Sequence, residues 1–142
     1  DKFRGRIMVP IYVGGRVVGF GGRTLPDAAK DAADRQAWKP PKYLNSPTSP
    51  VFTKSDTLFN YDQASERGKG ETLWIVEGYM DCVSLSVANV TRAVSTMGTS
   101  VAPGQMARAL DLAGGGKAVL LFDDDEAGRR AAVGVCERYA RE

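Results

Sequence analysis

The sequence predicts an α/β protein in which a small, β-rich, basic region precedes a parallel sheet with helices on both faces. From residue 71 onward, short apolar runs alternate with segments whose apolar residues recur at helical spacing. Before residue 71, strand patterns bounded by glycine and proline predominate, and positive charge is in excess. A length of 142 residues suits about one domain with a substantial core.

The chain opens with the pattern of a β-hairpin. Residues 6–13 (RIMVPIYV) and 16–22 (RVVGFGG) have strand composition, and the Gly-Gly pair between them predicts a tight turn. The glycines of the second strand, beside Arg23, allow a bulge or the close approach of a neighbouring group. We therefore expect the first two strands to pair with each other.

Two less regular segments follow the hairpin. Residues 26–39 predict a short polar helix or an insert, and the four prolines of PPKYLNSPTSPVF predict an ordered loop without regular structure. We expect the large aromatic residues to lie in the core rather than to stack on bases; these are Phe20, Trp38, Phe52, Phe59 and Trp74.

The second half alternates strands and helices. The predicted strands are 73–76, 93–97 and 118–122, and the predicted helices are 81–89, 102–113 and 127–140. Nearly continuous apolar strands separated by helices are typical of a parallel sheet covered on both faces. Right-handed crossovers then place the carboxyl ends of all the strands along one edge.

Acidic residues gather at this predicted edge. Glu77 follows the first strand, Asp81 lies one turn into the next helix, and Asp123 and Asp125 follow the third strand. Ligands of open α/β sheets bind outside the carboxyl ends of the strands, and carboxylate oxygens suit a hard cation such as Mg²⁺. The alternative is that the run DDDE only caps the following helix at its positive end.

Composition narrows the possible chemistry. The chain has no histidine, which excludes Cys/His zinc sites and Ser-His-Asp triads within it. Residues 1–61 hold ten Lys and Arg against five Asp and Glu, a net charge of +5, whereas residues 62–142 hold nine against twelve, a net of −3. This asymmetry predicts a polyanionic partner on one side and a cation on the other. Cys82 and Cys136 suit small buried residues better than a disulfide.

Several segments, in order, resemble known families. TLWIVEGYMD and LLFDDDEAGRRAA are similar to the Toprim domain shared by primases, topoisomerases and some nucleases. FRGRIMVPI, RVVGFGGR, PPKYLNSP and FTKSDTLF resemble the catalytic core of bacterial-type DNA primases. The resemblance implies a basic template- and nucleotide-binding subdomain over residues 1–70 and a Toprim domain over residues 71–142 that continues beyond Glu142.

The resemblance also assigns residues. Glu77 would be the central catalytic carboxylate, with Asp81 nearby, and Asp123 and Asp125 would be the aspartates of the family's D-G-D motif. Glu77, Asp123 and Asp125 would bind Mg²⁺, which Mn²⁺ can replace. Asp124 departs from the small middle residue of that motif and adds charge. The positions that match the family's DNA- and nucleotide-binding ridge are Lys2, Arg4, Arg23, Lys42, Tyr43, Asn45 and Lys54.

The implied function is synthesis of short RNA primers on single-stranded DNA from ribonucleoside triphosphates, in the primosome. A replicative helicase and a zinc-binding module would be engaged through regions outside this chain. The expected location is the bacterial cytoplasm (nucleoid), or a plastid or mitochondrion in a eukaryote, and no membrane is expected.

Three alternatives remain at the level of the sequence. A nuclease or topoisomerase fragment would share the Toprim motifs but would not need PPKYLNSP. A phosphatase-like use of Asp123 as a nucleophile disagrees with its place after the third strand. A Toprim scaffold that binds DNA without chemistry would not need to retain Glu77, Asp81, Asp123 and Asp125 together.

Overall fold

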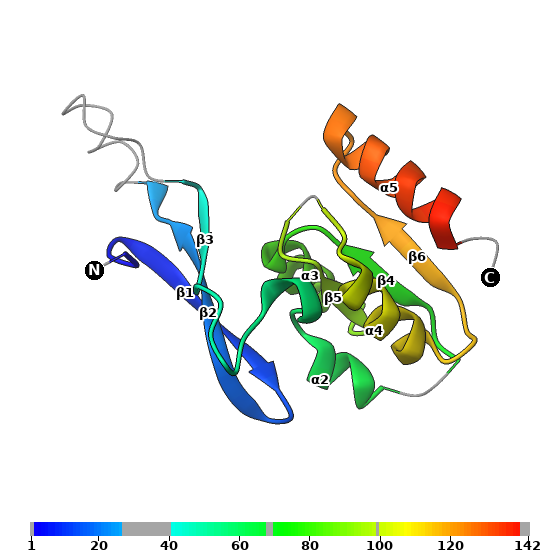
Figure 1. Ribbon diagram of the computed structural model, residues 1–142, viewed down its shortest axis with the longest axis horizontal. Coiled ribbons are helices and arrows are strands. Elements are labelled where there is room, and N and C mark those ends of the chain that lie inside the picture. The colour runs from blue at the N-terminus through cyan, green and yellow to red at the C-terminus, as the bar shows by residue number, and fades with distance from the viewer. Residues whose placement is uncertain (1, 27–40, 68–69, 99, 140–142) are drawn as a thin grey trace.

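The computed structural model describes residues 2–26, 41–67, 70–98 and 100–139. Within these ranges the chain forms two three-stranded sheets that lie side by side, with helices packed around the second (Figure 1). The first sheet is antiparallel and the second is parallel, as the sequence predicted.

The first sheet begins with the predicted hairpin. Strands β1 (Arg6–Val13) and β2 (Arg16–Thr24) pair antiparallel, and Gly14 and Gly15 between them have φ angles of 58° and 74°. A two-residue hairpin turn of this hand requires positive φ at both positions, which glycine adopts without strain.

The proline-rich segment corrects one prediction. It contains a strand, β3 (Tyr43–Asn45), which pairs antiparallel with β2 and places Tyr43 opposite Arg23. The prolines flank the three residues of this strand and do not interrupt it. The hydrogen bonds of β3 are made with the free edge of β2, a partner that the sequence of residues 43–45 does not indicate.

The parallel sheet follows the predicted alternation closely. Its strands are β4 (Leu73–Val76), β5 (Ala93–Ser95) and β6 (Ala118–Leu121). Its helices are α3 (Tyr79–Val87), α4 (Pro103–Ala113) and α5 (Glu126–Tyr139). Two short helices that the sequence analysis did not predict, η1 (Lys54–Asp56) and α2 (Tyr61–Ser65), lie between the two sheets in the chain.

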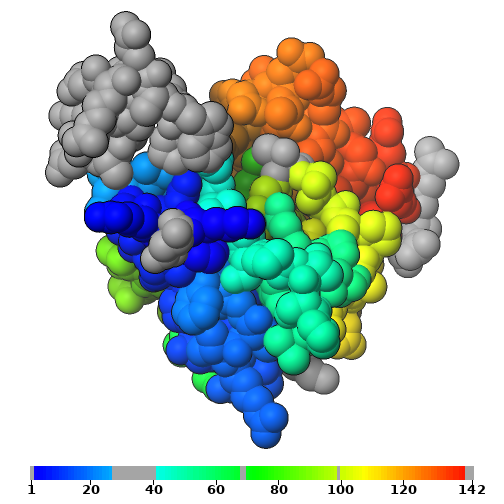
Figure 2. Space-filling view, turned by 60° about the vertical axis from the view of Figure 1, so that its left-hand side comes forward, coloured from blue at the N-terminus to red at the C-terminus, as the bar shows by residue number. Residues whose placement is uncertain are grey.

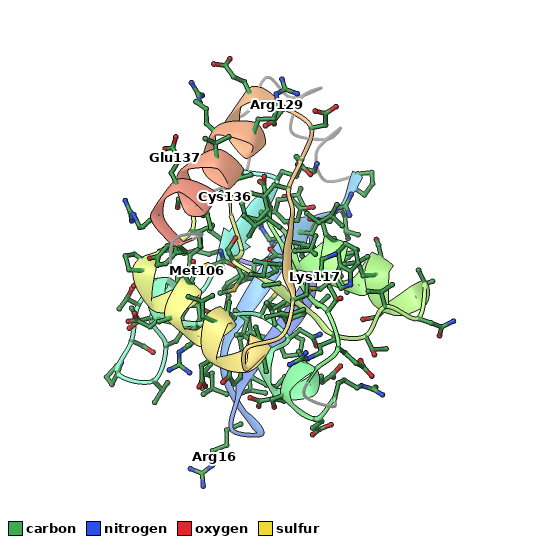
Figure 3. The ribbon with its side chains drawn as sticks, turned by 90° about the vertical axis from the view of Figure 1, so that its right-hand side faces the viewer. Arg16, Met106, Lys117, Arg129, Cys136 and Glu137 are labelled. Atoms are coloured by element: carbon green, nitrogen blue, oxygen red, sulfur yellow. The ribbon has the colours of Figure 1, made fainter. Side chains whose placement is uncertain are left out.

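Alternating residues of β4 build a core on each face of the sheet. Val76 packs with Cys82 of α3, whereas Ile75 packs with Met106 of α4 and Val135 of α5. Figure 3 views the molecule from the side of α4 and α5, on which Met106 and Cys136 are labelled. Helices therefore cover both faces, as predicted.

The order of the strands creates a crevice. The order is β5-β4-β6, so the chain leaves β4 on one side, returns across it and continues on the other side. Helices α3 and α5 consequently diverge onto opposite faces after β4 and β6. In sheets of this kind the carboxyl ends of the two strands at such a switch point bound the ligand crevice.

Tyr79 joins the two sheets. Its ring is 2% exposed and packs in one apolar cluster with Ile11 of β1, Phe52 and Met97. A Cβ atom on Gly21 would lie 2.8 Å from this ring, so the glycine lets β2 approach α3 closely. A second link is polar, because the Asp62 carboxylate accepts hydrogen bonds from both amides of the hairpin turn.

Some expectations about single side chains were wrong or fall outside the described residues. Phe20 is 42% exposed because it lies opposite Pro10 on the outer face of the hairpin, whereas Phe52 is buried as expected. Phe59 and Trp74 pack against core clusters, and Trp38 lies outside the described residues, as does the predicted helix or insert from residue 27 onward. Both cysteines are free, but only Cys82 is buried. Among the described helices, none is long and apolar enough to span a membrane.

Candidate active site

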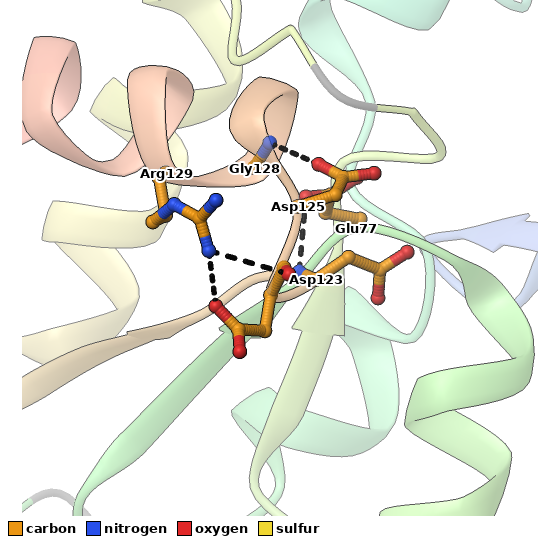
Figure 4. Close-up of polar contacts among 6 residues, drawn as sticks. Glu77, Asp123, Asp125, Gly128 and Arg129 are labelled. Carbon is orange, nitrogen blue, oxygen red and sulfur yellow. Dashed lines mark hydrogen bonds and ion pairs between the residues drawn. The ribbon is translucent and has the colours of Figure 1, made fainter.

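Glu77 occupies the crevice between β4 and β6. It follows β4 directly and is only 6% exposed. One of its carboxylate oxygens, Oε1, accepts a hydrogen bond of 3.2 Å from the backbone N–H of Asp123, which follows β6 (Figure 4). This hydrogen bond joins the Glu77 carboxylate to the main chain of Asp123, so the two residues lie at the same edge of the sheet.

The other acids of the cluster also accept backbone hydrogen bonds. Asp81 accepts one of 2.9 Å from Gly78 at the start of α3, and Asp125 accepts one of 2.7 Å from Gly128 at the start of α5. Asp124 forms an exposed ion pair of 2.5 Å with Arg129. The helix-capping interpretation of the acidic run is thus confirmed for Asp125, which caps α5 with one of its two carboxylate oxygens, Oδ1.

Gly128 makes room for this arrangement. A Cβ atom at this position would lie 2.8 Å from Glu77 Oε1 and closer still to the backbone oxygen of Asp123. The first turn of α5 can therefore approach the strand ends only because residue 128 has no side chain.

Burial raises the pKa of the Glu77 carboxyl above its ordinary value, and the nearby charges of Asp123, Asp125 and Asp81 raise that pKa further. The hydrogen bond from the Asp123 amide acts in the opposite direction. The ionised form of Glu77 is therefore disfavoured in the crevice, and a bound cation would stabilise it.

The ligand chemistry of the crevice suits a hard cation, although the acids are not gathered tightly. Among the residues that the structure describes, no group of three or more acidic or cysteine side chains is placed to hold a metal ion. Mg²⁺ commonly uses one or two carboxylates, with water and substrate phosphates completing its shell. Glu77 and Asp123, which both line the cleft described below, are the candidate carboxylates.

The main chain of Glu77 is held by a turn that the sequence analysis did not single out. The Ser95 hydroxyl and the Gly98 amide both donate to the carbonyl oxygen of Glu77, at 2.7 and 2.9 Å. Between them, Met97 adopts a φ of 60°, which is uncommon for a residue other than glycine. The run STMG carries no catalytic pattern, so only its position beside β4 reveals this role.

A basic and aromatic wall faces the acids. Arg23 and Lys42 lie 5.9 and 5.5 Å from the ring centre of Tyr43, which meets Tyr79 edge to face at 5.3 Å. Burial raises the pKa of the Tyr79 hydroxyl, and the backbone of Gly22 and the charges of Arg6 and Arg23 act in the opposite direction. The motif EGYMD contains Tyr79, but its spacing alone did not indicate a contact with Tyr43.

The two walls enclose one cleft of about 530 Å³. Figure 2 shows the surface hollowed between the cyan region of β3 and the orange start of α5. The described residues that line the cleft include, from the predicted set, Arg23, Lys42, Tyr43, Glu77, Asp81 and Asp123.

The remaining predicted residues lie around this cleft or away from it. Asn45 is in β3, and its buried amide oxygen has no hydrogen-bond partner. Lys54 is in η1, with its ammonium beside Gly98 at the cleft. Lys2 and Arg4 are exposed in the segment before β1 and are not among the described residues that line the cleft.

The sequence of the chain matches two family models. Residues 1–65 match the N-terminal domain of the DNA primase catalytic core, and residues 74–142 match the Toprim-like model. The DNA primase of Deinococcus radiodurans is 42% identical over 135 residues, which are 94% of this chain and 22% of that protein. The chain belongs to the bacterial-type DNA primases.

Solved structures of primases share the fold. The Escherichia coli primase catalytic core has a TM-score of 0.79 and 35% identity, covering 96% of this chain and 40% of that one. A DnaG primase catalytic domain bound to single-stranded DNA has a TM-score of 0.78 and 35% identity, covering 96% and 40%. The nuclease and topoisomerase alternatives are set aside, and the chain corresponds to about a fifth of the full primase from Deinococcus.

Two glycines of α5 provide a matched test of the crevice. Gly128→Ala should destabilise the fold by about 1–3 kcal/mol, because its methyl group would overlap the Asp123 backbone and crowd Glu77. Gly134→Ala, in open space on the same helix, should stabilise it by up to about 1 kcal/mol. Urea unfolding of the two variants measures the difference, and equal effects would mean that the start of α5 does not pack against Glu77.

The pKa of Glu77 predicts how stability depends on pH. Because this pKa is higher in the folded state, the folded protein binds more protons than the unfolded chain between the ordinary and the raised value. The contribution of Glu77 is thus fully present below the ordinary pKa and is lost as the pH rises through the raised one.

Glu77→Gln keeps an acceptor for the Asp123 amide and should remove that decline. Relative to the parent chain, the variant should gain stability as the pH rises, in urea unfolding with a chelator present at several values between about pH 4 and 8. Parallel stability curves for parent and variant would show that Glu77 ionises as it does in water.

Proposed function

We propose that this chain is the part of a primase catalytic core that binds template and nucleotide and forms the bond between ribonucleotides. The observation that carries the proposal is a single cleft with Arg23, Lys42 and Tyr43 on one wall and Glu77 and Asp123 on the other. A cationic wall suits phosphates, and an acidic wall suits the cation that accompanies them.

The basic wall would hold nucleic acid. Arg23 and Lys42 offer guanidinium and ammonium groups to phosphate oxygens, and the ring of Tyr43 between them can stack on a base. The relative bound to single-stranded DNA supports this type of partner. We extend the surface to Arg4, Asn45 and Lys54, which the family resemblance assigns to the same ridge.

The acidic wall would hold Mg²⁺, which Mn²⁺ can replace. Glu77 and Asp123 both line the cleft, and Asp125 can cap α5 with one carboxylate oxygen while the other remains for the ion. Asp81 adds negative charge near Glu77. When bound, such an ion supplies positive charge to the phosphate oxygens at the reacting centre.

The reaction is nucleotidyl transfer. The 3′-hydroxyl of the growing primer forms a bond to the α-phosphorus of a ribonucleoside triphosphate, and pyrophosphate leaves. The side chains of the cleft orient these partners and offset the negative charge of the phosphates, and none of them needs to act as a covalent nucleophile. Residues 1–70 would thus contribute the template and nucleotide contacts, and residues 71–142 the acids. A helicase partner would be reached through other parts of a longer protein.

A scaffold that binds DNA without chemistry is the second candidate. It would use the basic wall alone, and the acidic crevice would then only hold the strand ends together. The two functions differ in what Glu77 does, so charge removal at that position separates them.

Glu77→Gln and Asp123→Asn test the acidic wall. Each retains size and hydrogen-bonding capacity but removes a charge, so primer synthesis by the full-length protein should fall by orders of magnitude at saturating Mg²⁺. Binding of single-stranded DNA should persist. If both variants synthesise primers normally, these acids are structural and the acidic wall is not the reacting centre; a full-length parent protein that binds single-stranded DNA but makes no primers would instead support the scaffold interpretation.

Asp124→Gly is the matched control. It removes the neighbouring charge and the exposed ion pair with Arg129, which is worth less than about 1 kcal/mol. Activity should be unchanged or higher. Loss of synthesis with Asp124→Gly but not with Glu77→Gln would place the ion elsewhere.

The basic wall predicts a dependence on salt. Single-stranded DNA should bind this chain more weakly as salt rises, and Arg23→Ala or Lys42→Ala should each flatten the log–log slope by about 0.7. Arg138→Ala, an exposed change on α5, should leave the slope unaltered. An equal effect of Arg138→Ala would mean that binding follows overall charge and not this wall.

A further inference from the structure

Gln105 is a buried polar residue whose contacts join three segments. It lies in the first turn of α4 and is 1% exposed. Its amide nitrogen lies 2.9, 3.0 and 2.9 Å from the carbonyl oxygens of Lys54, Thr57 and Thr96, so its two N–H groups donate to three acceptors and one hydrogen is shared. Its amide oxygen accepts from the Ala102 amide at 3.1 Å, so both ends of the side-chain amide are used.

These contacts connect η1 to the turn that holds Glu77. The Lys54 carbonyl belongs to η1, and the Thr96 carbonyl belongs to the turn whose Ser95 and Gly98 donate to the Glu77 carbonyl. A single side chain therefore fixes the distance between the two segments. Burying the side-chain amide of Gln105 costs free energy unless its N–H groups and its oxygen are all hydrogen-bonded.

The side chain of Lys54 lies against the same turn. A Cβ atom on Gly98 would be 2.9 Å from the Lys54 ammonium nitrogen, and Gly98 lines the cleft. The first turn of α4 also touches η1 closely, because a Cβ atom on Gly104 would overlap the Asp56 carboxylate. The position of the ammonium thus depends on how η1 sits on α4.

We propose that Gln105 is a positioning residue that fixes the Lys54 ammonium beside Gly98, at the edge of the cleft and near the backbone of Glu77. The consequence for DNA binding rests on the proposed function, in which Lys54 contacts nucleic acid. The position of the Lys54 side chain does not depend on the proposed function. Its position and its effect on DNA binding can therefore be tested separately.

The first measurement is the placement itself. Nuclear Overhauser contacts between the Lys54 Cε protons and the Gly98 Cα protons should be present in the 142-residue chain and lost in Gln105→Met, which has similar volume but no donors. Gly104→Ala keeps the Gln105 amide but displaces η1, and it should lose the same contacts.

Met106→Ala is the control for stability, because Met106 is buried on the same helix but packs into the core against Ile75. It should keep the contacts, and their persistence in Gln105→Met and Gly104→Ala would overturn the proposal.

The second measurement is a double-mutant cycle on the binding of single-stranded DNA. Lys54→Ala should flatten the salt slope by about 0.7, and Gln105→Met should flatten it in the parent chain but not in the Lys54→Ala background. A full effect of Gln105→Met in that background would contradict action through Lys54. An unchanged slope in Lys54→Ala would refute the DNA-binding role of Lys54, while the Overhauser contacts would still decide the positioning role.

Discussion

Glu77 connects the carboxyl ends of all three parallel strands. It follows β4, its carbonyl accepts two hydrogen bonds from the turn after β5, and its carboxylate accepts one from the residue after β6. The side chain is buried, so these contacts are shielded from water and are correspondingly costly to break. Glu77 is therefore the residue that links the ends of all three strands at the crevice of the sheet.

The acids around Glu77 combine structural and chemical capacity. Asp81 and Asp125 satisfy amides at the starts of α3 and α5, and the positive ends of those helices favour their charge. The consecutive acids after β6 are tolerated because amides and an exposed arginine offset part of their charge, and because β6 itself is only partly buried. Burial is the main reason that the pKa of Glu77 is raised, and the charges of the neighbouring acids add to it.

The two halves of the chain meet at Tyr79, which lies two residues after Glu77. Its ring fills the space below Gly21 and meets Tyr43 edge to face, so the basic wall is built directly on the helix that begins at the acidic wall. The opposite charges of the halves thus face each other across one cleft. A small displacement of β2 would alter both walls together, because Gly21 packs directly against the ring of Tyr79 with no space for a further atom.

The hairpin, the succession of strands and helices along the second half of the chain and the acids after the strands could all be predicted from the amino-acid sequence. These follow from local periodicity, turn residues and the handedness of crossovers, all of which are written in short stretches of sequence. Strand β3, the exposure of Phe20 and the contacts of Ser95, Tyr79 and Gln105 could not be predicted in this way and became evident from the folded structure. Most of these depend on a partner distant in the chain: the free edge of β2, the carbonyl of Glu77, the ring of Tyr43, or carbonyls of η1 and of the turn after β5. Local pattern fixes which elements form, but a hydrogen bond or ring contact between distant segments exists only once the fold has brought both groups together.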